Sequence, residues 1–226
     1  MSYTTWPLGH IPEHLQRPEL KQLKEAGYEF NDPREVIDIF EKKVAAFAGS
    51  KYAVAVDSCS HGIFLSLKYL QYEDIVILPE HTYVSVPLQV EHSGAEYTFE
   101  TRKWSGVYQL TPTRIFDGAG RWTEGMYVGN NALHVLSFQI KKHIPIGKGG
   151  MILTDEEYAY NWLKLASYDG RDLNKDYTVD IPAIKGWHYY MTPEDAARGI
   201  LLMDQKPPVN EDSHDSTKYP SLKFKL

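Results

Sequence analysis

The sequence has few of the features that mark secreted, membrane-spanning or nucleic-acid-binding proteins. It contains a single cysteine, Cys59, so no intrachain disulfide can form and a reducing, cytoplasmic location is expected. It has no run of about eighteen apolar residues that would cross a membrane, and residues 1–12 lack the basic and apolar regions of a secretory signal. The formal net charge is −6, and basic residues gather only in a local patch at 141–148. Neither nucleic acid nor a membrane is therefore an expected partner.

Short apolar runs alternate with helical patterns from residue 32 onward. Asp32, Pro33 and Glu35 are typical of a helix start, apolar residues then recur at helical spacing, and Gly49 provides a stop. Strands are predicted at 52–56, 75–78, 97–99, 114–116, 134–138 and 150–153, and further helices at 62–70, 83–91, 155–167 and 193–203. This alternation indicates an α/β fold with a mostly parallel, mixed sheet sandwiched by helices. We expect an N-terminal arm at 1–31, one large domain at 32–204 and a polar C-terminal tail at 205–226.

The residues that follow each predicted strand are the candidates for chemistry, because ligands of such sheets bind at the carboxyl ends of the strands. Segment 58–62, Ser-Cys-Ser-His-Gly, leaves a strand and opens a helix. Free backbone N–H groups and the helix dipole attract an anion such as phosphate at such a point. Simple helix capping by the serines is the alternative.

Asp117 and Lys142 are the two charged candidates at this edge of the sheet. Asp117 ends an apolar strand, where a carboxylate is poorly solvated and requires a cationic partner. A protonated pyridine nitrogen is one such partner, and an arginine or a helix cap is another. Lys142 lies between another strand and the glycine-rich turn 147–150. A desolvated lysine can act as an amine nucleophile and form a Schiff base. A structural carboxylate and a solvated lysine are the alternatives when each residue is taken alone.

Several short motifs occur in order along the chain. They are Ser58-Cys59-Ser60-His61-Gly62-Ile63, Pro79-Glu80-His81-Thr82-Tyr83, Asp117-Gly118-Ala119, Ser137-Phe138-x-x-x-Lys142, Gly149-Gly150, Thr154-Asp155 and Gly186-Trp187-His188-Tyr189-Tyr190-Met191-Thr192, followed by Ala196-Ala197. Together they resemble the large domain of the DegT/StrS-type sugar aminotransferases, fold type I enzymes that depend on pyridoxal 5′-phosphate (PLP). The resemblance runs from about residue 32 to residue 203. It implies an aminotransferase that moves an amino group from glutamate to a nucleotide-linked keto-sugar.

The resemblance also implies a role for each matching residue. Lys142 would form the Schiff base with PLP and then move the proton between substrate and cofactor, and Lys141 is the alternative if the register is off by one. Asp117 would keep the pyridine nitrogen protonated, so that the ring acts as an electron sink. Tyr83 would stack on the ring.

The phosphate and the neighbouring subunit complete the implied site. Ser60 and His61, through their backbone, and Ser137, through its hydroxyl, would hold the phosphate. In the family, the segment that matches His188 to Tyr190 reaches into the neighbouring subunit's site. The resemblance therefore implies a homodimer with shared active sites, in which His188 contributes to cofactor binding.

Three departures from the family pattern bear on activity. Gly120 occupies the position at which the family has a glutamine or histidine near the cofactor's phenolic oxygen. Residues 187–191 read Trp-His-Tyr-Tyr-Met where the family has Tyr-Asn-Tyr-Arg-Met, and tyrosine cannot replace a bidentate arginine. A short polar tail stands in place of the family's second, smaller domain. The missing walls of the site would come from the dimer or from another chain, or turnover is impaired. A PLP-binding protein with lost, altered or partner-dependent activity is thus the alternative function.

Other classes of site fit the sequence less well. Gly118-Ala119-Gly120 lacks the third glycine of a dinucleotide-binding motif, because Thr123 occupies its place. His10 and His14 lack the glutamate of a zinc-binding helix, and no metal site is predicted. Cys59 is more typical of a small packed residue than of a nucleophile. The sugar dehydratase branch of the same family carries histidine in place of the Schiff-base lysine, whereas this chain has Lys142.

Overall fold

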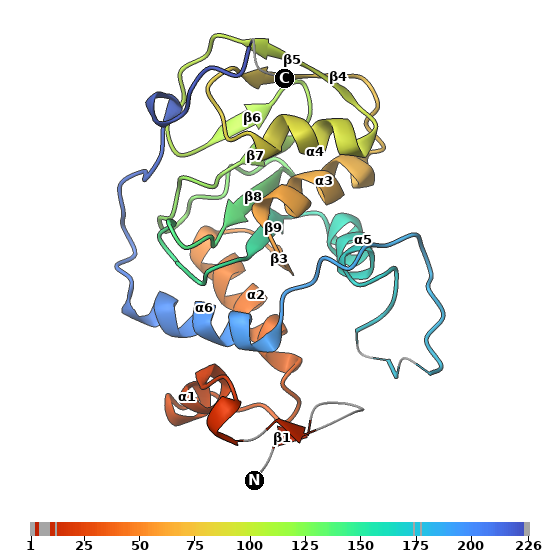
Figure 1. Cartoon of the computed structure of the whole chain (residues 1–226), viewed down its shortest axis with the longest axis vertical. Coiled ribbons are helices and arrows are strands. Elements are labelled where there is room, and N and C mark those ends of the chain that lie inside the picture. The colour runs from red at the N-terminus through yellow and green to blue at the C-terminus, as the bar shows by residue number, and fades with distance from the viewer. Residues whose placement is uncertain (1–2, 5–9, 12, 174, 177, 224–226) are drawn as a thin grey trace.

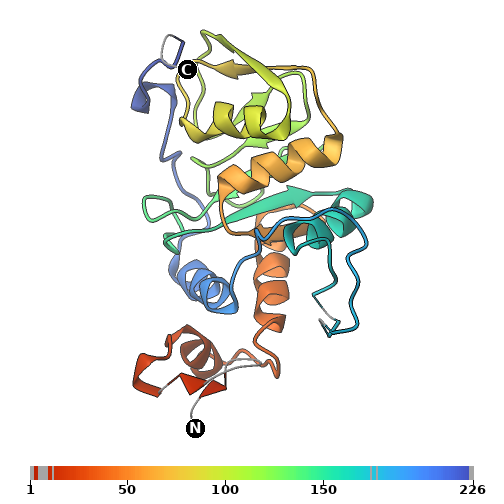
Figure 2. The ribbon, with the colours of Figure 1, turned by 45° about the vertical axis from the view of Figure 1, so that its right-hand side comes forward.

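The computed structural model describes residues 3–4, 10–11, 13–173, 175–176 and 178–223. The expectation about residues 1–12 therefore lies largely outside the described residues. In the described part of the chain, a mixed sheet lies between layers of helices (Figures 1 and 2). None of the described helices is long and apolar enough to cross a bilayer.

The main sheet has the strand order β3-β9-β8-β7-β6. Its strands are β3 (Tyr52–Val56), β6 (Tyr108–Leu110), β7 (Ile115–Asp117), β8 (Leu133–Ser137) and β9 (Gly150–Thr154). The pair β7/β8 is parallel, and the pairs β3/β9, β8/β9 and β6/β7 are antiparallel.

A second, parallel pair extends this sheet beyond β6. It consists of β4 (Ile75–Pro79) and β5 (Glu96–Glu100), and Ile77 of β4 makes an antiparallel bridge with Thr111 just after β6. As a result β3, β4, β5, β7 and β8 run in one direction, and β6 and β9 run in the other. The predicted α/β class with a mixed, mostly parallel sheet is confirmed.

The side chains of each strand pack alternately into two separate hydrophobic cores, because successive residues of a strand point to opposite faces of the sheet. In β3, Val54 and Val56 face a core shared with α3 (Cys59–Leu70), α4 (Ser85–Ser93) and α5 (Glu157–Ser167). Ala53 and Ala55 face the other core, with α2 (Glu35–Ala48) and α6 (Pro193–Gln205). Figure 2 shows α3 and α4 on one side of the sheet and α2 and α6 on the other.

The predicted helices and strands occur close to their expected ranges. Helix α2 begins at Glu35, whose carboxylate accepts a hydrogen bond from the Asp32 N–H at 3.1 Å, as in a capping box. It ends at Gly49, whose φ of 81° lies in the left-handed region that glycine adopts without strain.

The two predicted terminal segments are more ordered than expected. Residues 1–31, predicted as an arm, include α1 (Glu19–Glu25), and Leu23 of α1 is fully buried in the core next to α6. They also include the short strands β1 (Tyr3–Thr4) and β2 (His10–Ile11), which pair antiparallel. Helix α1 is only seven residues long, too short for its periodicity to be read from the sequence.

Residues 207–222, here named the C-terminal segment, run along one side of the sheet, against the loops at its edge, instead of leaving the protein as a tail. In Figure 1 this segment is the blue chain that rises from α6 toward β4 and β5. Backbone hydrogen bonds hold it at several points, including Ser213 N to Gly120 O at 2.8 Å, Gly106 N to His214 O at 2.8 Å and Leu222 N to Glu80 O at 2.9 Å. Such pairing depends on the backbone and leaves no periodic pattern of side chains, so the sequence did not predict it.

Candidate active site

A pocket of about 480 Å³ opens at the carboxyl ends of β3, β4, β7 and β8. Residues at or just after each of these strands line it, among them Ser58, Thr82, Asp117 and Ser137. This is the edge at which the strand-end rule places a ligand. Most of the predicted site residues lie in this pocket: Ser60, Tyr83, Asp117, Ser137 and Lys142.

Lys142 reaches the pocket because the chain turns sharply after β8. The Phe138 N–H donates to Gly149 O at 2.9 Å and the Lys142 N–H donates to Gln139 O at 2.8 Å, so the intervening residues form a compact loop. The Lys142 side chain is half-buried, and among the described residues its amine has no hydrogen-bond or ion-pair partner. Burial lowers the pKa of this amine, against the opposing negative charge of Asp117. A lowered pKa increases the share of neutral, nucleophilic amine.

Lys141, the alternative in the neighbouring register, also lines the pocket, but its side chain is exposed. Desolvation, which makes a lysine a nucleophile, therefore applies to Lys142.

Asp117 is buried at the end of β7, with 6% of its surface exposed. The Tyr108 hydroxyl donates to its Oδ2 at 2.8 Å, and the Ala119 N–H donates to its Oδ1 at 2.9 Å. Burial raises the pKa of this carboxyl, while these two donors and the charge of Lys142 act against the rise. A carboxylate has about four lone-pair sites, so Asp117 can still accept a further hydrogen bond from a ligand.

Helix α3 points its N-terminus into the pocket. Ser58 is the N-cap, and its hydroxyl accepts a hydrogen bond from the His61 N–H at 3.2 Å. Ser60 follows in the first turn, with its hydroxyl 2.7 Å from that of Ser85. Gly150 of β9 makes this arrangement possible, because a Cβ there would lie 2.6 Å from both the Ser58 carbonyl carbon and the Cys59 nitrogen. The free N–H groups of the helix start and the serine hydroxyls together suit an anion.

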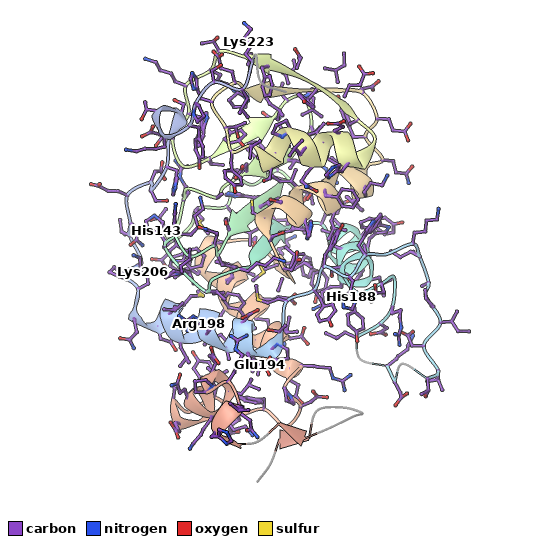
Figure 3. The ribbon with its side chains drawn as sticks, in the orientation of Figure 1. His143, His188, Glu194, Arg198, Lys206 and Lys223 are labelled. Atoms are coloured by element: carbon purple, nitrogen blue, oxygen red, sulfur yellow. The ribbon has the colours of Figure 1, made fainter. Side chains whose placement is uncertain are left out.

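Two predicted site residues have side chains outside the pocket. The His61 ring stacks on Tyr189, with ring centres 3.7 Å apart, and its Nδ1 lies 2.6 Å from Asp57 Oδ1. His188 is exposed, and its Nδ1 lies 2.8 Å from Asp169 Oδ2. In Figure 3 His188 lies on the opposite side of the molecule from His143, the neighbour of Lys142. Within one chain His188 therefore does not join the pocket, and its predicted role in a partner's site stays a prediction.

Several residues of the pocket wall were not predicted as site residues. They include Trp104, Tyr108, His214, Lys218 and Tyr219. Tyr219 lies at the centre of an aromatic group, stacked on Trp104 at 5.8 Å and on His214 at 6.1 Å between ring centres. No local sequence pattern connects Trp104 to the C-terminal segment, which follows more than 100 residues later.

The C-terminal segment also explains the space around Gly120. A Cβ at Gly120 would lie 3.0 Å from the His214 carbonyl oxygen and 3.1 Å from Gly106 Cα. The space next to Gly120, where a family glutamine or histidine side chain would begin, is therefore occupied by backbone of this segment and of Gly106.

A known protein family matches most of the chain. The model of the DegT/DnrJ/EryC1/StrS aminotransferase family matches residues 17–101 and 117–215. The chain belongs to this family. The resemblance seen in the sequence motifs is confirmed. Residues 102–116 and 216–223 of the described chain lie outside the match, as do the described residues before 17.

One curated relative is the spore coat polysaccharide biosynthesis protein SpsC of Bacillus subtilis. The two proteins are 26% identical over 196 residues, and this alignment covers 67% of this chain and 50% of SpsC. It therefore spans about half the length of this curated relative.

Two solved structures share the fold. Spr1654 of Streptococcus pneumoniae in its PLP form has a TM-score of 0.64 at 14% identity, and the match covers 85% of this chain and 65% of that one. DesI, solved in the presence of its TDP-sugar product, has a TM-score of 0.61 at 20% identity, with 82% of this chain and 56% of that chain covered.

Proposed function

We propose that this chain binds PLP in the pocket, bonded to Lys142, and acts as an aminotransferase on a nucleotide-linked keto-sugar, with glutamate as amino donor. The observation that carries the proposal is the half-buried amine of Lys142, which has no partner in the described part of the chain and lies in the same pocket as the buried carboxylate of Asp117. Membership of the DegT/StrS family, the PLP form of Spr1654 and the TDP-sugar product of DesI support the cofactor and the substrate class.

The residues of the pocket fit PLP at its aldehyde, its ring nitrogen, its phosphate and its ring face. When bound, PLP supplies an aldehyde that forms a Schiff base with an amine and a ring that takes up an electron pair. Lys142 would provide the amine for this bond and, as a free amine, would move a proton at the substrate carbon. Asp117 accepts the hydrogen bond of the protonated ring nitrogen and keeps the proton there.

The remaining groups bind the phosphate and the ring face. The N-terminus of α3 with Ser60, together with Ser137, provides N–H and O–H donors for the phosphate. Tyr83 lines the pocket with 58% of its surface exposed, so its ring is available for stacking. We propose that the protein works as a homodimer in which His188 of one protomer contributes to the other protomer's site.

A PLP-binding protein with lost, altered or partner-dependent activity is the second candidate. One observation favours it: Tyr190 stands where the family pattern has an arginine, and in this chain its ring packs against Tyr168 at 5.1 Å. A tyrosine cannot form the bidentate hydrogen bonds of an arginine with an anionic group of a substrate.

An absorption spectrum with added PLP, before and after L-glutamate, separates the two candidates. The proposed function predicts a yellow band that glutamate bleaches. A yellow band that glutamate leaves unchanged would favour the second candidate, and no band would refute both.

Borohydride reduction followed by peptide mapping tests the lysine. The cofactor should be found on the peptide that carries Lys142, and Lys142→Ala should abolish the trapped product. The matched control Lys141→Ala removes the exposed neighbour and should leave trapping intact. A product that persists on this peptide in Lys142→Ala would contradict the assignment.

A further inference from the structure

Tyr108 contacts the buried carboxylate of the pocket from a part of the chain that the family model does not match. It lies within the unmatched stretch 102–116, on β6, whereas Asp117 begins the second matched region. Strand β6 pairs antiparallel with β7 in a register that places Tyr108 directly opposite Asp117. The short strand β6 therefore places the Tyr108 side chain against Asp117, the most deeply buried charged group of the pocket.

The hydrogen bonds of Tyr108 have a defined direction. Its hydroxyl donates to Asp117 Oδ2 at 2.8 Å, because an ionised carboxylate only accepts. The Thr82 hydroxyl lies 2.5 Å from the same tyrosine oxygen, and since the tyrosine proton is already used, Thr82 must be the donor. The result is a chain of two hydrogen bonds that runs from Thr82 through Tyr108 to Asp117 and ends on a charge, so that each bond strengthens the other.

The two hydrogen bonds from Thr82 through Tyr108 to Asp117 are shielded from solvent, and a neighbouring side chain packs against Tyr108. Tyr108 has 6% and Thr82 1% of its surface exposed. Trp104 packs on Tyr108 with ring centres 4.7 Å apart, and the Trp104 indole N–H donates to His81 O at 2.8 Å. Tyr108 thus has little freedom to leave Asp117.

The contact has two effects on the carboxylate. It gives Oδ2 a donor inside the protein, where an unpartnered charged oxygen would be costly. It also fixes the rotation of the carboxylate, because Ala119 N holds Oδ1 while Tyr108 holds Oδ2. The lone pairs that remain free then keep one orientation for a ligand.

We propose that Tyr108 is a positioning residue that keeps Asp117 ionised and oriented toward the ring nitrogen of bound PLP. This inference rests on the proposed function, since it concerns the same cofactor. It adds a residue from outside the family match, and it predicts that Tyr108 acts on one atom of the cofactor.

Two ligands test this directly in the purified full chain: PLP, and its carbocyclic analogue in which a C–H replaces the ring nitrogen. Both retain the aldehyde and the phosphate, so they differ only where Asp117 acts. Dissociation constants are measured for both ligands by quenching of tryptophan fluorescence. Tyr108→Phe should weaken PLP binding about tenfold, as expected for one hydrogen bond to a charged group, and should change binding of the analogue by less than about twofold.

Tyr127→Phe is the matched control, because Tyr127 is also partly buried and donates to a backbone carbonyl, Ala132 O at 3.1 Å, away from the pocket. It should leave binding of both ligands unchanged. If Tyr108→Phe does not fold, Thr82→Val removes the first donor of the chain and should weaken PLP selectively, by a smaller factor of about three.

Unchanged PLP binding in Tyr108→Phe would overturn the inference, and so would an equal loss for PLP and the analogue, because that would show a general distortion of the pocket. Failure of the wild-type chain to bind PLP would refute the proposed function itself and the inference with it. Wild-type binding of PLP with no selective loss in the variants would refute only the inference.

Discussion

Replacing Gly118 with alanine should strongly destabilise the protein, because the new methyl group would overlap the ring of His134. An ideal Cβ at Gly118 lies 2.0 Å from His134 Nε2 and 2.6 Å from Cδ2. The φ of Gly118 is outside the left-handed region, so alanine brings no backbone strain there and the cost is steric. His134 is fully buried and cannot move into solvent. We expect a loss of about 3 kcal/mol in the free energy of unfolding, at the upper end for overpacking a core.

A second substitution makes the cause measurable. His134→Ala removes the ring at the cost of a cavity, but neither ring nitrogen of His134 has a hydrogen-bond partner among the described residues, so its removal also relieves two unsatisfied polar atoms. In the double variant the methyl group occupies space left by the ring. The double variant should therefore be more stable than the sum of the single effects predicts, by about 2 kcal/mol.

Urea unfolding of the wild type, both single variants and the double variant gives the four free energies that this cycle needs. Additivity within about 0.5 kcal/mol would refute the steric explanation. The slopes of the unfolding curves should be equal in all four proteins, since a changed slope would mean that the unfolded or native state had altered.

The same histidine predicts a pH dependence of stability. Burial lowers the pKa of His134 from 6.5 to about 3. Between these values the unfolded state binds a proton that the folded state does not, so stability falls as the pH decreases below 6.5. Over this range His134 changes the free energy of unfolding by about 1.4 kcal/mol per pH unit, and the His134→Ala variant should lack this pH dependence. An unchanged pH profile in His134→Ala would contradict the assigned pKa.

Two further predictions concern the ion pairs Lys164–Glu41 and Arg121–Asp212. Lys164→Met leaves the buried carboxylate of Glu41 without the ammonium group 2.8 Å away, so the free energy of unfolding in urea should fall by about 3 kcal/mol. Adding Glu41→Gln should recover part of that loss. No recovery would argue against a stabilising ion pair. Asp212→Ala removes the carboxylate that Arg121 holds through bonds of 2.9 and 2.7 Å. Because this pair is partly exposed, global stability should change by less than about 1 kcal/mol, while amide hydrogen exchange should become faster within the C-terminal segment. Faster exchange spread over the whole chain would contradict this local role.

The local sequence pattern was sufficient for most of the framework. Strands β3, β4, β8 and β9 are short apolar runs, and α2 has both its capping residues and its glycine stop, so local interactions and periodicity are enough to predict these elements. The rule that ligands bind at the carboxyl ends of strands then placed Asp117 and Lys142 at one edge, and the structure puts both in one pocket.

The sequence by itself determined the α/β class, the order of the elements and the main charged residues of the pocket, because each of these follows from side-chain periodicity or from a motif a few residues long. Only the tertiary structure decided that β6 lays Tyr108 against Asp117 and that the C-terminal segment forms a wall of the pocket with Tyr219 and His214. Strand β6 has only three residues, too few for its side-chain pattern to be recognised, and the C-terminal segment is held by backbone hydrogen bonds to residues far away in the chain. Backbone groups are the same at almost every position, so local sequence patterns do not show which of them pair in the folded protein.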